Sequence, residues 1–159
     1  MTVAVIGIGQ SMRGDDAAGL EAVNLWQRRY PQTAGRAELR VATIEAPGLD
    51  LLDLLGGADG ALLVDAVCSG ATPGALHRLG PQQLSEFRQA AGSAHTWGVA
   101  QVLKLEAALE PHQARRTVRL LAIEAAQTEL GTGLSAPVAA ALESACELIE
   151  AEVTSLLGI

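Results

Sequence analysis

The sequence predicts one α/β domain, residues 1–159, in which a mostly parallel sheet of about five strands lies between two layers of helices. Apolar, β-branched runs alternate along the chain with segments of helical periodicity, which is the order expected for such a fold. With one Phe, one Tyr and two Trp, the core must be built from Ala, Val, Leu and Ile, which suit helices packed on a sheet. Because 49% of the residues are hydrophobic and 18% charged, the chain can fill one such core.

Residues 2–9 (TVAVIGIG) predict the first strand, because a continuous apolar run is typical of a strand buried on both faces of a parallel sheet. A loop with Asp15 and Asp16 follows, and then a helix that reaches Tyr30. Further strands are predicted at 38–45, 61–67, 75–79 (a short edge strand) and 117–123, and helices at 49–55, 81–90 and 97–109.

The last helix is predicted to begin after Ser135 as N-cap, with Pro137 in its first turn. One apolar stripe follows, formed by Val138, Leu142, Ala145, Ile149 and Val153. In a parallel sheet the carboxyl ends of the strands meet at one edge, which is where sites of α/β proteins lie.

Composition and charge argue against several classes of protein. A formal net charge of -7 speaks against a nucleic-acid partner. No apolar run approaches the roughly 20 residues of a membrane-spanning helix. The start of the sequence lacks the basic segment of a secretory signal, so a cytoplasmic location is expected. Cys68 and Cys146 form no CxxC motif and are interpreted as ordinary buried thiols.

The glycine-rich loop after the first strand does not match a phosphate-binding motif. The third glycine of a dinucleotide fingerprint is replaced by Met12, and carboxylates follow where a pyrophosphate would lie. Lys104 is the only lysine, so no Walker P-loop is present, and no G-x-S-x-G motif for a nucleophilic serine occurs. No organic cofactor is expected.

Asp16, Asp65 and His95 are the candidate site residues. Each has a structural explanation of its own: Asp16 could complement a helix dipole, Asp65 could accept backbone hydrogen bonds, and His95 could lie on the surface. All three come from a loop or a strand end, and the carboxyl edge of the sheet could bring them together. Two carboxylates and one imidazole suit a borderline divalent ion with open positions for water or substrate.

Cys68 offers a second chemistry. It follows Asp65 by three residues and could act with His95 as a thiolate nucleophile, which would give a Cys68-dependent hydrolase. The simpler interpretation is a small apolar side chain after a strand.

Four segments resemble the nickel-iron hydrogenase maturation proteases. VAVIGIGQSMRGDDAAGLEAV resembles the family's first strand and Gly-Asp-Asp/Glu loop, and LLVDAVCSGATPGALHRL resembles its third-strand segment. SAHTWGVAQVLKL is similar to its Ser-x-His segment, and AIEAAQTELGTGLSAPVAAAL to its closing segment. They occur in the family's order and cover most of the chain. Gln10 replaces a usual Asn, and Ala46-Pro47 a common Gly-Thr.

The resemblance implies an endopeptidase that removes the C-terminal extension of a nickel-iron hydrogenase large-subunit precursor after nickel insertion. It implies Asp16, Asp65 and His95 as ligands of a nickel ion that the substrate carries. A non-catalytic, nickel-dependent binding module for the large subunit is the alternative. We expect the precursor to bind near the loops at 46–49 and 70–73.

Overall fold

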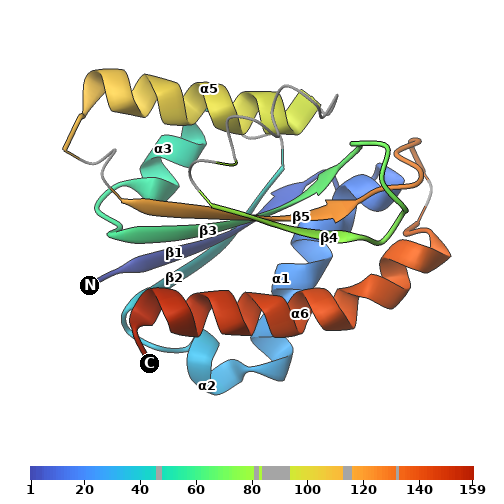
Figure 1. Ribbon diagram of the computed structural model, residues 1–159, viewed down its shortest axis with the longest axis horizontal. Coiled ribbons are helices and arrows are strands. Elements are labelled where there is room, and N and C mark those ends of the chain that lie inside the picture. The colour runs from blue at the N-terminus through green and yellow to red at the C-terminus, as the bar shows by residue number, and fades with distance from the viewer. Residues whose placement is uncertain (46–47, 81–82, 84–93, 113–115, 132) are drawn as a thin grey trace.

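The computed structural model describes residues 1–45, 48–80, 83, 94–112, 116–131 and 133–159 (Figure 1). The side chains of residues 94–98 and 100 are also outside the described part. Apart from residue 83, the helix predicted at 81–90 lies outside the described residues.

Five strands form one sheet in the order β2-β1-β3-β5-β4. The neighbours β2, β1, β3 and β5 run parallel, and β4 is an antiparallel edge strand beside β5. The prediction of a mostly parallel five-stranded sheet with a short edge strand is confirmed. The strands are β1 (Val3–Gly9), β2 (Leu39–Glu45), β3 (Gly60–Val67), β4 (Leu76–Leu79) and β5 (Thr117–Glu124).

Helices cover both faces of the sheet, which confirms the three predicted layers (Figure 1). On one face α1 and α6 pack against the strands, and α3 and α5 pack on the other. The helices are α1 (Ala18–Arg29), α2 (Pro31–Ala34), α3 (Asp50–Leu55), α5 (Ala94–Leu109) and α6 (Ala136–Leu157), and a 3-10 turn, η1 (Gly14–Ala17), precedes α1.

The two cores explain the continuous apolar runs of the central strands. Along β1, Val3 and Val5 enter the core under α1 and α6, whereas Ala4 and Ile6 enter the core under α3 and α5. Since successive side chains of a strand point to opposite faces, a strand covered on both faces needs apolar residues at every position. The strand therefore ends at the carboxyl edge with its whole length buried.

One local prediction was wrong. Helix α5 begins at Ala94 rather than at Trp97, so His95 lies in its first turn and not in the loop before it. Ser135 is the N-cap of α6 and Pro137 lies in the first turn, as predicted. The Ser135 side chain makes no capping bond, because its hydroxyl group donates to Asp15 instead.

Within the described residues, no helix combines the length and the apolar composition that crossing a bilayer requires.

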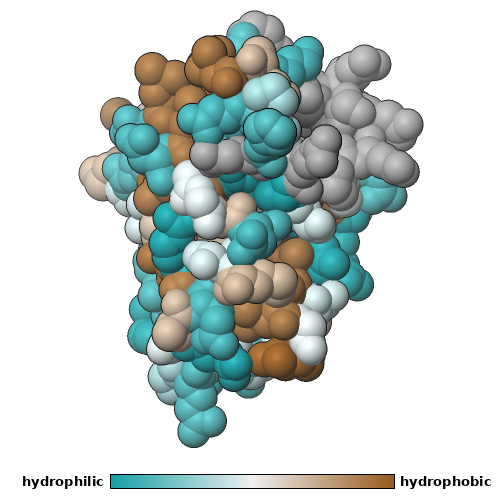
Figure 2. All heavy atoms as spheres, turned by 90° about the vertical axis from the view of Figure 1, so that its left-hand side faces the viewer, coloured by the Kyte–Doolittle hydropathy of each residue, from teal (hydrophilic) through white to brown (hydrophobic). Residues whose placement is uncertain are grey.

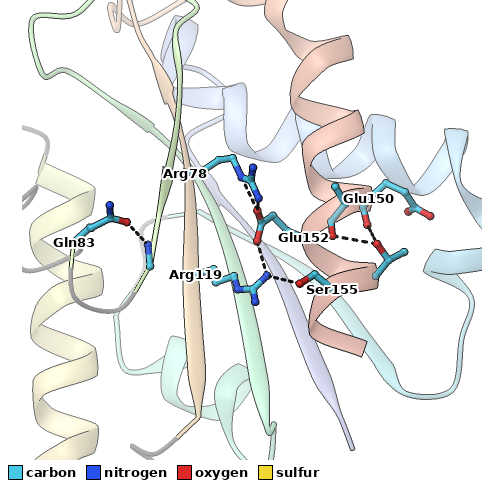
Figure 3. A network of polar contacts seen from close by, with 9 residues as sticks. Arg78, Gln83, Arg119, Glu150, Glu152 and Ser155 are labelled. Atoms are coloured by element: carbon cyan, nitrogen blue, oxygen red, sulfur yellow. Dashed lines mark hydrogen bonds and ion pairs between the residues drawn. The ribbon is translucent and has the colours of Figure 1, made fainter. Parts of the chain in front are cut away.

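A buried carboxylate ties α6 to the edge of the sheet (Figure 3). Glu152 on α6 accepts hydrogen bonds from Arg78 Nε (2.6 Å to Oε1) and from Arg119 Nη1 (2.7 Å to Oε2). Arg119 Nη1 also donates to Ser155 Oγ at 3.1 Å. Burial opposes ionisation of Glu152, but the two guanidinium groups hold the pKa of this carboxyl below its usual range.

We expect Glu152→Gln to lower the free energy of unfolding by about 1–2 kcal/mol near neutral pH, because it leaves two partly exposed guanidinium groups without a charged partner. With a depressed folded-state pKa, the carboxylate stabilises fully above the unfolded-state pKa, and this contribution is lost as the pH falls through the folded-state value. Urea titrations of the two proteins should give a constant difference above about pH 5 that shrinks below it. A difference that grows on acidification would contradict this assignment.

Candidate functional site

Asp65 lies near the end of β3 and is buried, with 1% of its surface exposed. Its Oδ1 accepts a hydrogen bond from the backbone N–H of Ala66 at 2.8 Å. Its Oδ2 is buried and has no hydrogen-bond partner among the residues that the structure describes. Because an unpaired buried carboxylate oxygen is costly, this atom marks a position that suits a donor or a cation.

Asp16 lies in η1, half-buried, close enough to act on Asp65. Burial raises the pKa of Asp65 well above its usual range, and the negative charge of Asp16 raises it further, against the opposing hydrogen bond from Ala66. Two of the three predicted site residues are therefore brought together at the carboxyl edge of the sheet.

Two glycines allow this approach. A Cβ atom at Gly9, the last residue of β1, would lie 2.1 Å from the carbonyl oxygen of Asp16. A Cβ at Gly19 on α1 would lie 2.3 Å from the carbonyl oxygens of both Ile8 and Val64. Since neither position can hold a side chain without displacing backbone, the glycines bring η1 and α1 against the ends of β1 and β3. Close packing accounts for the glycines at these two positions.

His95 lies in the first turn of α5. Figure 1 shows this end of α5 on the right, on the side where the parallel strands end. The side chain of His95 is outside the described part, so its meeting with the two carboxylates stays a prediction. Among the side chains that are described, no group of three or more His, Cys, Asp and Glu could hold a metal ion.

Asp15, next to Asp16, holds η1 against the connection between β5 and α6. Its fully buried carboxylate accepts hydrogen bonds from the backbone N–H groups of Ala126 (2.8 Å), Gln127 (3.0 Å) and Ser135 (2.6 Å), and from Ser135 Oγ (2.7 Å). Burial would raise the pKa of Asp15, but these hydrogen bonds outweigh it and lower the pKa below its usual value. The Gly-Asp-Asp segment thus contains one structural carboxylate, Asp15, and one candidate site carboxylate, Asp16.

The sequence analysis missed Glu124, the last residue of β5. Its buried carboxylate accepts hydrogen bonds from Ser69 and Gly70, in the loop that follows β3. The signal that identified Asp65, a carboxylate at the end of an apolar strand, also applies to Glu124. Together with Glu45, whose Oε1 accepts a 3.0 Å hydrogen bond from the N–H of Ser11, these residues make the carboxyl edge acidic.

Cys68 follows β3 and is exposed, which corrects the expectation of a buried thiol; Cys146 is buried as predicted. Partial desolvation raises the pKa of Cys68, and the charges of Glu124, Asp16 and Asp15 raise it further. A nucleophilic thiolate needs the opposite surroundings, namely nearby positive charge.

Two pockets lie away from this edge. One of about 490 Å³ is lined by Arg78, Arg119 and Glu152 of the network in Figure 3. The other, of about 350 Å³, includes Leu109 of α5. Figure 2 looks onto the end where the strands begin, with hydrophobic residues gathered at the level of α5. Leu109, the last residue of α5, is 66% exposed. Neither Asp16 nor Asp65 is among the described residues that line these two pockets.

A family model described as hydrogenase maturation protease matches residues 28–152. The chain is 30% identical over 145 residues to the hydrogenase expression/formation protein HupM of Azotobacter chroococcum mcd 1, which covers 90% of this chain and 67% of HupM. It is 32% identical over 108 residues to the hydrogenase expression/formation protein HupD of Thiocapsa roseopersicina, covering 67% of this chain and about half (48%) of HupD.

The fold is similar to solved structures over nearly the whole chain. The [NiFe] hydrogenase maturation protease HybD from Thermococcus kodakarensis superposes with a TM-score of 0.82 at 26% identity, covering 96% of this chain and 99% of that one. The hydrogenase maturating endopeptidase HybD from E. coli gives a TM-score of 0.83 at 22% identity, covering 98% and 93%. The second likeness concerns the fold alone.

These matches define a class of peptide-bond hydrolases built on an αβα domain. The chain belongs to the hydrogenase maturation protease family, as its sequence motifs indicated.

We expect Asp15→Ala to lower the free energy of unfolding by about 2–4 kcal/mol, because four donors lose their charged acceptor. Urea unfolding followed by the fluorescence of the buried Trp26 measures this difference. A loss of less than about 0.5 kcal/mol, the size of an ordinary surface substitution, would contradict the structural role.

Asp65→Asn should act in the opposite direction and raise the free energy of unfolding by about 1 kcal/mol. The substitution keeps an acceptor for Ala66 N–H, and it removes a buried charge that lies near Asp16. The same urea titration tests it, with Asp15→Asn as the matched control that should destabilise. If both substitutions destabilise equally, Asp65 is a structural carboxylate like Asp15.

Proposed function

We propose that this protein removes the C-terminal extension of a nickel-iron hydrogenase large-subunit precursor once nickel has been inserted. Asp16, Asp65 and His95 bind the nickel ion that the precursor carries. The single observation that carries this proposal is the buried Oδ2 of Asp65, which lacks a partner among the described residues and lies near a second carboxylate.

The donor set supports a metal that belongs to the substrate. Two carboxylates and an imidazole give three protein ligands, which leave coordination positions for groups of the precursor and for water. The acidic edge attracts a cation, because Asp16 and Asp65 raise the local negative potential and no described counter-charge is bonded to Asp65 Oδ2. Such a site recognises a precursor only after its nickel is in place.

The chemistry follows from the metal and needs no protein nucleophile. Nickel held beside the scissile bond would polarise the carbonyl group or lower the pKa of the attacking water. The raised pKa of Cys68 argues against the Cys68-dependent hydrolase. The cytoplasmic location and the lack of a nucleic-acid partner stay predictions from the sequence.

Asp16→Ala, Asp65→Ala and His95→Ala should each reduce processing by about 100-fold or more, because each removes one ligand of the metal. The measurement is the intact mass of a nickel-loaded large-subunit precursor before and after incubation with each variant. Circular dichroism and urea titration establish that each variant is folded.

The matched control is His112→Ala, an exposed histidine that follows α5, which should process normally. Cys68→Ser tests the thiolate alternative, and a variant that still removes the extension excludes Cys68 as the nucleophile. Precursor without nickel should keep its extension. Normal processing by any of the three ligand variants would refute the proposed site. A wild-type protein that binds the nickel-loaded precursor without shortening it would instead be the non-catalytic binding module.

A further inference from the structure

Glu124 holds the segment 68–75, which joins β3 to β4, from within the sheet. Only 1% of Glu124 is exposed. Its Oε1 accepts hydrogen bonds from the N–H groups of Ser69 (2.7 Å) and Gly70 (3.1 Å). Its Oε2 accepts one from Ser69 Oγ (2.7 Å) and lies 3.1 Å from Nε2 of His77. Three polar groups of the connection, together with His77 of β4, thus converge on a single carboxylate.

The backbone of Glu124 holds the other end of the same segment. Its carbonyl oxygen accepts a hydrogen bond from Gly74 N–H (2.8 Å), and its N–H donates to the carbonyl oxygen of Ala75 (2.9 Å). Gly74 has a φ of 85°, and a Cβ there would lie 2.5 Å from the carbonyl oxygen of Pro137. The segment is therefore fixed at both ends and packed against the start of α6.

This segment adjoins the candidate site. It begins three residues after Asp65, and Cys68 is near enough to Asp16 for that charge to act on its thiol. Its middle residues Ala71 and Thr72 are exposed. A fixed backbone with exposed small side chains beside the two carboxylates suits contact with a polypeptide.

We propose that the segment 68–75 is a rigid wall that binds the precursor's polypeptide next to the scissile bond, and that Glu124 is the positioning residue that fixes this wall. The inference rests on the proposed function and extends it to substrate binding. Ionisation of Glu124 fits this role, because burial raises its pKa but the hydrogen bonds from Ser69 and His77 lower the pKa more.

The position of Asp65 does not depend on this wall. Asp65 is paired with Ala122 within the β3–β5 ladder, which continues to Val67 and Glu124 through backbone bonds. Loss of the Glu124 carboxylate therefore frees the Ser69–Gly70 end of the wall and leaves Asp65 in place. A substrate-binding wall that loosens weakens binding more than it slows the chemical step, so KM should change and kcat should not.

Glu124→Ala tests the wall in the full-length protein. Amide hydrogen exchange at Ser69 and Gly70 should become about 10-fold faster or more, because both N–H groups lose their acceptor. The KM for a nickel-loaded large-subunit precursor should rise about 10-fold, with kcat within about threefold of wild type. Glu124→Gln keeps one carbonyl acceptor and should recover part of both effects.

Glu152→Gln is the matched control, since it also neutralises a buried, hydrogen-bonded glutamate but on α6. It should lower stability and leave KM unchanged. Ala71→Arg should raise KM by about 10-fold without faster exchange, whereas Ala151→Arg, at an exposed alanine of α6, should have no effect.

An unchanged KM in both Glu124→Gln and Ala71→Arg would overturn the proposal, as would an equal rise in KM for Glu152→Gln. If Glu124→Ala does not fold, Glu124→Gln and Ser69→Ala provide the same comparison. If the wild-type protein binds the precursor without shortening it, the proposed function fails, and the dissociation constant of the same variants still decides whether the wall binds substrate.

Discussion

Carboxylates buried at the carboxyl edge of the sheet organise this end of the molecule. Asp15 and Glu124 are each satisfied by several donors, and each holds a loop against the strands. Asp65 is equally buried, but one of its oxygens has no partner among the described residues. Asp15 and Glu124 are satisfied by several donors, so the unpaired oxygen of Asp65 near Asp16 is the exception on which the proposed cation site rests.

At this edge, a residue that supports the fold can be the direct neighbour of a candidate site residue. Asp15 and Asp16 are adjacent, yet the first faces the loop before α6 and the second acts on Asp65. The cost of burying charge in the supporting residues is offset by hydrogen bonds from loop backbones, which are thereby fixed. Rigid surroundings of this kind keep the carboxylates of Asp16 and Asp65 close together although their charges repel.

Family membership and local geometry support different levels of the functional conclusion. The matches to hydrogenase maturation proteases make the chain a peptide-bond hydrolase. In the proposed function, the acidic edge distinguishes a precursor that carries nickel from one that does not. The exposed Cys68, in contrast, lies among negative charges that oppose its ionisation, so its position beside Asp65 does not make it a nucleophile.

The sequence alone determined the fold class and the order of the strands along the chain, and it selected Asp16 and Asp65 as candidate site carboxylates. Continuous apolar runs such as residues 2–9 indicate strands that are buried on both faces of a sheet. Parallel strands then bring their carboxyl ends to one edge. Only the tertiary structure decided which carboxylates bind loops, that Ser135 donates to Asp15, and that Glu124 fixes the segment 68–75. These contacts join residues up to 120 positions apart, and no local pattern records such a pairing.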